Sequence, residues 1–194
     1  MNHTVQAYAR GLAVPLDDLL ESSALLRDDI QRLLDAFADS WDDQTFRRVF
    51  VRASWSYIEA VVFGLKQLVL TACTLGSEDL SFKTRGFLSE QRIEVNSRGE
   101  AKVLVVHTET MKNIKMTLKL ASTQFDVAWR PAFGNGSWDR LRQSLQIRHR
   151  LTHPKTATEL QVQDEELDLH REAFMWFAQG FNEFLVSTQR RYGA

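Results

Sequence analysis

The spacing of apolar residues along the chain predicts a protein built mainly of helices. From Leu16 to Phe37 apolar side chains recur every three or four residues, the period of a helix with one buried face. We expect this first amphipathic helix within residues 15–43, with Pro15 as its entry residue, because the first turn tolerates proline. A second, longer helix is predicted from Gln44 to Leu75, since its apolar stripe is wide enough for the centre of a bundle.

A β-hairpin is predicted to interrupt the helical pattern near residues 91–107. Residues 92–95 alternate between polar and apolar, residues 101–106 are apolar apart from Lys102 and include three β-branched valines, and residues 96–99 between them are turn formers. The free edges of such a hairpin can pair with another chain, although charged side chains such as Lys102 are typical of a guarded edge.

The rest of the chain returns to a helical pattern. Residues 111–125 fit both an alternating strand and a helix, but the helical series is longer and contains good helix formers, so we predict a helix. Proline and glycine in residues 129–136 predict a loop, after which Ser137 is a suitable N-cap for a helix that ends near Pro154. A last amphipathic helix is predicted to begin at Asp164.

Together these elements predict a mainly α fold: a bundle of about five helices with one inserted β-hairpin, in a single domain spanning residues 1–194. The hydrophobic share of 44% and the charged share of 25% are ordinary for a globular protein. The only cysteine, Cys73, excludes an internal disulfide and a thiolate zinc site. The start of the chain lacks a signal-peptide pattern, and the apolar run 58–75 contains Glu59 and Lys66. We therefore expect a cytoplasmic protein without a membrane partner.

Charge is distributed unevenly although the net charge is only −1. Residues 17–43 hold nine acids against two arginines, whereas residues 130–155 hold six bases against Asp139 alone. Within that basic block, residues 148–153 contain two arginines and two histidines directly before Pro154. His149 and His153 lie about 40° apart on one helix face, and Arg148 about 140° from His153. We expect Pro154 to loosen the last turn, so that Arg148 and His153 reach a common ligand.

Several functions are open to these residues. Cations at a helix C-terminus can simply complement the macrodipole. A zinc site shared by His149 and His153 is disfavoured, because Arg150 stands where a metalloprotease has glutamate and would repel the ion. Cys73 lies on an apolar stripe with no base nearby, which indicates a buried structural thiol. We therefore predict neither a metal nor a cofactor.

Metal-free cleavage of RNA by its own 2′-hydroxyl is the chemistry that suits this run best. Histidine can transfer a proton near neutral pH, arginine can stabilise the charged phosphorane, and a basic surround can hold the RNA backbone. Residues 147–154, IRHRLTHP, have the form Arg-polar-x-x-x-His and resemble the signature of the HEPN domain family, with His149 where most members have asparagine.

The resemblance implies an all-helical core over residues 44–192, to which the hairpin is an addition. It also implies a homodimer in which two copies of the motif face each other and cleave RNA without metal. The protein would then be a toxin or an antiphage defence effector, with RNA as substrate and an antitoxin or defence-system protein as a further partner.

Site residues follow from the same resemblance. Arg148 would stabilise the phosphate, His153 would act as general base or acid, and His149 would position the substrate or assist. Glu59 is the expected partner that orients a basic group on a neighbouring helix. The side chains expected to contact RNA are Arg142, Arg150 and Lys155. A non-catalytic HEPN-like module that binds RNA, nucleotides or proteins is the competing hypothesis, in which the Arg/His run is a satisfied helix end.

Overall fold

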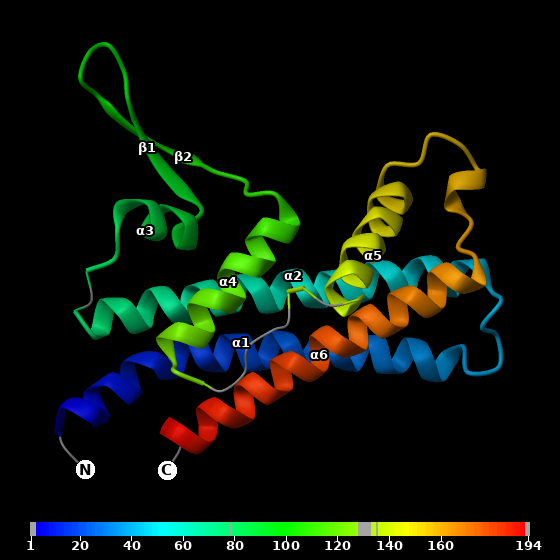
Figure 1. Cartoon of the computed structure of the whole chain (residues 1–194), viewed down its shortest axis with the longest axis horizontal. Coiled ribbons are helices and arrows are strands. Elements are labelled where there is room, and N and C mark those ends of the chain that lie inside the picture. The colour runs from blue at the N-terminus through cyan, green and yellow to red at the C-terminus, as the bar shows by residue number, and fades with distance from the viewer. Residues whose placement is uncertain (1–2, 78, 128–132, 135, 193–194) are drawn as a thin grey trace.

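The computed structural model describes residues 3–77, 79–127, 133–134 and 136–192, and for residues 3–9 and 192 only the backbone. The chain is mainly helical with a single two-stranded antiparallel hairpin, so the predicted fold class is confirmed (Figure 1). The elements are α1 (His3–Ala36), α2 (Gln44–Leu75), α3 (Phe82–Ser89), β1 (Gln91–Val95), β2 (Ala101–Val105), α4 (Thr110–Gln124), α5 (Gly136–Thr152), the 3-10 helix η1 (Thr158–Leu160) and α6 (Asp164–Tyr192).

Helix α2 is the centre of the bundle and contacts α1, α3, α4, α5 and α6. Its bounds agree with the sequence prediction. Asp43 caps its start, because the carboxylate accepts hydrogen bonds from the N–H groups of Phe46 and Thr45, which lower the pKa of Asp43. By length and composition α2 could cross a membrane, but half of its most apolar stretch is buried. Side chains such as Ile58 and Leu65 lie in the core.

Helix α1 runs antiparallel to α2 along almost its whole length (Figure 1). The two helices pack closely, since a Cβ atom built on Gly64 would lie 2.6 Å from the Cδ1 atom of Leu19. The prediction that Pro15 begins this helix is wrong, because α1 starts at His3 and Pro15 lies inside it. Proline costs one backbone hydrogen bond within a helix. Burial of Leu12 and Leu19 on either side of it holds the helix against α2.

Helix α3 and the hairpin form one unit on α2. Helix α3 was not predicted from the sequence; it has eight residues and buries only Leu88. Glu90 joins α3 to β1 in a left-handed conformation with φ of 54°, and its carboxylate pairs with Lys66 of α2 at 2.9 Å. The Lys66 side chain is 1% exposed and its Nζ atom also lies 4.3 Å from the ring of Phe87. The predicted hairpin is confirmed, with Ile93 opposite Val103.

Helices α4, α5 and α6 complete the bundle. The ambiguous segment 111–125 is helical, as predicted. The loop predicted at residues 129–136 falls largely outside the described residues. Helix α5 begins at Gly136, so Ser137 lies in its first turn and is not the cap that we predicted. Helix α6 begins at Asp164 as predicted, with three carboxylates in the first turn, where they complement the positive end of the helix dipole.

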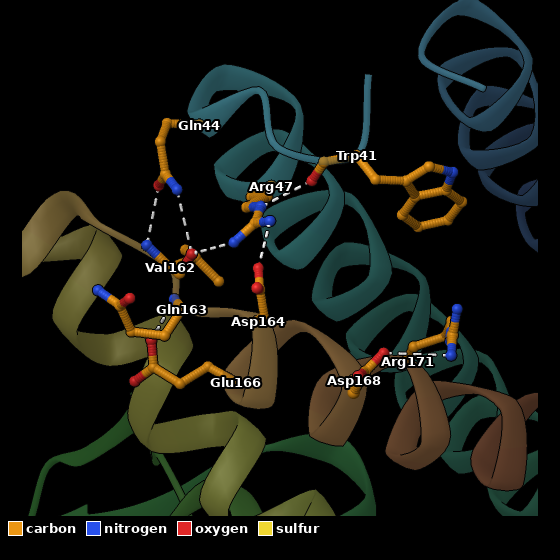
Figure 2. A network of polar contacts seen from close by, with 9 residues as sticks. All are labelled: Trp41, Gln44, Arg47, Val162, Gln163, Asp164, Glu166, Asp168 and Arg171. Carbon is orange, nitrogen blue, oxygen red and sulfur yellow. Dashed lines mark hydrogen bonds and ion pairs between the residues drawn. The ribbon is translucent and has the colours of Figure 1, made fainter. Parts of the chain in front are cut away.

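A network of polar contacts holds the connection between α5 and α6 against the start of α2 (Figure 2). The amide of Gln44 donates to the carbonyl of Val162 at 3.1 Å and accepts from its N–H at 2.9 Å. Arg47 is buried and donates to the carbonyls of Trp41 and Val162, both at 2.7 Å, and to the carboxylate of Asp164 at 2.5 Å. The chain at Val162 and Asp164, where it enters α6, is therefore fixed by α2.

Candidate functional site

The arginines and histidines at the end of α5 point toward different neighbours. Arg148 pairs with Glu59 of α2 at 3.0 Å, with 26% of the arginine side chain exposed. A basic group on a neighbouring helix is thus oriented by Glu59, as the sequence suggested. Arg150 points to α6 instead, where it donates to Glu166 at 2.8 Å and to the carbonyl of Gln161 at 3.0 Å.

The C-terminal carbonyls of α5 also receive a donor from α2. Arg52 donates to the carbonyl of Leu151 at 2.6 Å, which satisfies one of the acceptors that a helix end leaves free. The hydroxyl of Thr152 donates to the carbonyl of Arg148, one turn earlier on the same helix, at 2.8 Å. The end of α5 is therefore fixed from within the protein, and side chains that remain exposed there project from a rigid support.

His153 is exposed and keeps helical backbone geometry at its own N–H. That N–H donates to the carbonyl of His149 at 3.0 Å, so helical hydrogen bonding reaches His153, the first residue after the end of α5 at Thr152. On an unbroken helix the two side chains of Arg148 and His153 would lie about 140° apart, and His153 stands one residue past the end of α5. Among the described residues, no hydrogen bond or ion pair joins the two side chains. Their convergence on a common ligand stays a prediction.

His149 lies in a groove between α5 and the start of α4. The groove has a volume of about 780 Å³ and is lined from α5 by Trp138, Arg142, Gln146 and His149. The opposite wall contributes His107 from the β2–α4 connection and Lys112 and Lys115 from α4, with Glu109 as the acidic residue of the lining. Two predicted residues, Arg142 and His149, thus share one basic groove.

Two of the groove cations have acidic neighbours on the surface. Lys112 lies 3.4 Å from Glu109 and Arg142 pairs with Asp139, and all four side chains are at least half exposed. Such exposed pairs contribute little stability, so an incoming phosphate can compete for these cations. Lys115 is placed differently, with its Nζ atom 5.4 Å from the centroid of the Phe133 ring.

One face of α5 connects the groove to the helix end. Three side chains of α5 follow one another in a row at intervals of four and three residues: Arg142, Gln146 and His149. His153 continues this spacing four residues later, directly after the end of the helix. Lys155 is exposed just beyond this row. Arg148 and Arg150 lie outside it, because they point to α2 and α6. The predicted residues therefore divide into a row along one face of α5 and two arginines that point to other helices.

His170 forms a separate, buried group of polar side chains. Its Nδ1 atom lies 2.7 Å from the Oγ atom of Ser144, which accepts a hydrogen bond from the indole N–H of Trp55 at 3.0 Å. Burial lowers the pKa of His170 to about 3, so the imidazole is neutral at physiological pH. Among the described residues, no three histidine, cysteine, aspartate or glutamate side chains are grouped as metal ligands.

The α4 side of the groove was not predicted from the sequence. Lys112 and Lys115 have the i,i+3 spacing that places two cations on one helix face, which was the available signal. That signal is weak, because exposed lysines are common on any helix. For His107 the sequence offers no such signal, since this residue lies in a connection whose position depends on how the hairpin is attached.

Comparisons of the chain with protein families, with curated proteins and with solved structures found no match. The resemblance of residues 147–154 to the HEPN signature therefore stays a prediction.

Proposed function

We propose that the protein is a metal-independent endoribonuclease of the HEPN type, which cleaves RNA by attack of a 2′-hydroxyl. The observation that supports this most directly is the basic groove beside α5, from which one row of side chains leads through His149 to the exposed His153. A groove with cations on both walls suits the phosphate backbone of RNA, and an exposed imidazole at its end suits proton transfer.

Arg148 has the role of stabilising the phosphate in this proposal. Its ion pair with Glu59 engages one terminal nitrogen, and a guanidinium has five N–H donors in total. Because Glu59 is 45% exposed, the pair is open to water, and a phosphate can bind the remaining donors. Glu59 would thus orient Arg148 and still leave N–H donors of its guanidinium available to a phosphate.

The proposal includes a homodimer. The resemblance implies that two motifs face each other, and a phosphate between two copies would be reached by Arg148 of one and His153 of the other. A role as a toxin or antiphage defence effector, controlled by an antitoxin or a defence-system protein, belongs to the same proposal.

A second candidate function is binding of RNA without cleavage. It is favoured by the pairing of both arginines of the run, Arg148 with Glu59 and Arg150 with Glu166. In this case the groove would hold RNA through Arg142, and the two arginines would serve to attach α5 to its neighbours.

One experiment separates the two candidates. The purified protein is incubated with single-stranded RNA in the presence of EDTA, and cleavage and binding are measured in parallel for the wild type, Arg148→Ala and His153→Ala. Arg98→Ala, in the exposed turn of the hairpin, is the matched control. We expect cleavage by the wild type and the control, and loss of at least about 100-fold in both motif variants.

Binding that persists with no cleavage in any protein would favour the second candidate. Cleavage that disappears with chelator, or that both motif variants retain, would contradict the proposed mechanism.

A further inference from the structure

The hairpin stands away from the helical bundle (Figure 1), and its aliphatic side chains on one face are exposed. Four aliphatic side chains on that face are 52–69% exposed: Ile93, Val95, Val103 and Val105. A two-stranded sheet is at most marginally stable alone, and a cluster of exposed aliphatic side chains marks an interaction surface. The hairpin is therefore suited to contact with another chain.

The hydrogen-bond pattern of the hairpin shows which backbone groups face outward. The N–H of Val106 donates to the carbonyl of Glu90, and the N–H of Asn96 donates to the carbonyl of Glu100. In an antiparallel ladder bonded and non-bonded positions alternate, so Arg92 and Glu94 also bond toward β2. Gln91, Ile93 and Val95 consequently direct their N–H and C=O groups to the free edge of β1.

We propose that two copies of the chain pair along these β1 edges, antiparallel and around a two-fold axis at Ile93. The product is a four-stranded sheet in the order β2–β1–β1–β2. Ile93 then lies opposite the partner's Ile93, and Gln91 lies opposite the partner's Val95. Every outward N–H and C=O group of these three residues finds a partner, because the pairs fall at bonded positions of the new ladder.

Charge complementarity selects β1 over β2 for this pairing. In the proposed register Arg92 lies opposite the partner's Glu94, and the symmetry repeats this pair. Arg92 and Glu94 already attract each other along their own strand at 2.5 Å, and both side chains are more than half exposed. The same operation on β2, centred on Val103, would place Lys102 opposite an apolar Leu104. Opposite charges directly across a sheet are stabilising, so the β1 edge is the self-complementary one.

This inference goes beyond the proposed function, because the β1 contact is separate from the contact between two motifs in that proposal and does not depend on RNA cleavage. The hairpin contributes none of the groove residues on α4 or α5. The glutamate that precedes β1 holds the hairpin to the core through buried Lys66, so the edge is presented by a fixed support.

Engineered disulfides test the proposed register. In Ile93→Cys the two new thiols lie on the axis at a bonded pair, where Cα atoms are about 5.5 Å apart, within the range of a disulfide. Val103→Cys is the matched control, because Val103 lies directly opposite Ile93 on the same face with similar exposure. Its two copies would be three strand spacings apart, about 14 Å. The native Cys73 is buried in both variants.

We expect Ile93→Cys to form a covalent dimer on mild oxidation, seen on a non-reducing gel, while Val103→Cys stays monomeric on the same gel. Cross-linking of both variants to the same extent would indicate that the apolar faces stack, and would overturn edge pairing through β1. Failure of Ile93→Cys to cross-link would overturn it as well.

Charge reversal supplies a second, independent test. Arg92→Glu and Glu94→Arg each place like charges opposite one another at two symmetric positions, which we expect to raise the dimer dissociation constant about tenfold. The exchange Arg92→Glu with Glu94→Arg restores opposite charges and should return the constant to the wild-type value. Sedimentation equilibrium measures all three, and circular dichroism verifies that each variant is folded.

A wild type of 22.4 kDa that sediments as a monomer up to about 100 μM would overturn the proposal. So would a dimer that is insensitive to both single reversals, since it would form elsewhere on the molecule. RNA cleavage is measured separately, so loss of the dimer and loss of the nuclease are distinguishable outcomes.

Discussion

Arg148 and Arg150 are two residues apart, yet different glutamates orient them. Arg148 is paired with Glu59 across to α2, and Arg150 with Glu166 across to α6. Both ion pairs are partly exposed and should contribute less than about 1 kcal/mol to stability. The two arginines differ in where they point, Arg148 toward α2 and Arg150 toward α6. Only Arg148 belongs to the proposed catalytic pair.

The two glutamates therefore provide a matched comparison. We predict that Glu59→Gln lowers the rate of RNA cleavage about tenfold or more, because Arg148 loses the carboxylate that orients it. Glu166→Gln should leave the rate within about twofold, because Arg150 has no catalytic role in the proposal. Initial rates and RNA affinities of both variants measure this, with affinity expected to be unchanged. Equal losses in the two variants would contradict the positioning role of Glu59.

His170 predicts a pH dependence of stability with a definite sign. Its pKa is about 3 in the folded protein, because the ring is buried, whereas an exposed histidine has a pKa of 6.5. The unfolded chain binds a proton at this residue below about pH 6.5 that the folded protein does not. The contribution of neutral His170 to stability is thus complete above about pH 6.5 and is lost as the pH falls toward about 3. Over this range the free energy of unfolding should fall by up to about 1.4 kcal/mol per pH unit.

Urea unfolding of the wild type and of His170→Gln between pH 7 and pH 4.5 measures this effect. A glutamine side chain does not titrate, so the variant should lose stability less steeply as the pH falls, even though it is less stable at pH 7. Parallel slopes in the two proteins would show that the imidazole is not neutral in the folded state.

At the scale of elements, the close packing of α1 on α2 depends on a glycine. A Cβ atom at Gly64 would lie 2.6 Å from the Cδ1 atom and 3.1 Å from the Cβ atom of Leu19, a side chain that is 1% exposed. We predict that Gly64→Ala lowers the free energy of unfolding by about 1 kcal/mol, because overpacking exceeds the gain in helix propensity. In a Leu19→Ala background the same change should be neutral or stabilising. Chemical denaturation of the four proteins measures the coupling, and additive effects would contradict it.

Local patterns predicted the elements that have strong periodicity. The apolar stripe of α2 and the turn residues of the hairpin are encoded within the segments themselves, so their bounds were predicted closely. Helix α3 has eight residues and one buried side chain, too few to produce a periodic pattern. Pro15 was assigned to the start of α1 because local rules favour that position, and tertiary packing on α2 overrides them.

The candidate site was predictable in part for the same reason. The Arg/His run and its placement at the end of a helix are local, as is the spacing that sets His149 and His153 on one face. The groove is not local, because His107 and Lys112 meet His149 only after the hairpin and α4 are positioned by α2. Ion pairing of Arg150 with Glu166 was equally hidden, since it depends on the connection after Pro154.

At the scale of the whole molecule, a net charge of −1 conceals a groove that is locally basic. RNA binding there should weaken as the salt concentration rises, because the lysine and arginine side chains of the groove displace counterions from the RNA phosphates. We predict that the double variant Lys112→Ala with Lys115→Ala binds RNA more weakly. The slope of the logarithm of the binding constant against the logarithm of the salt concentration should become smaller by about 1.4, because each cation on single-stranded RNA contributes about 0.7. The double variant Lys83→Ala with Lys102→Ala, on α3 and β2, is the control and should retain the wild-type slope. Equal slopes for wild type and groove variant would place RNA elsewhere.

The attachment of Val162 by Gln44 and Arg47 has a consequence for the continuity of the chain. Residues 152–158 are all exposed, so a cut there removes no buried contact. The severed C-terminal piece would still carry the Val162 amide and the apolar face of α6, both of which dock on the N-terminal piece. Two co-expressed fragments divided near Thr156 should accordingly reassemble into a soluble complex, which makes this protein a natural candidate for a split reporter.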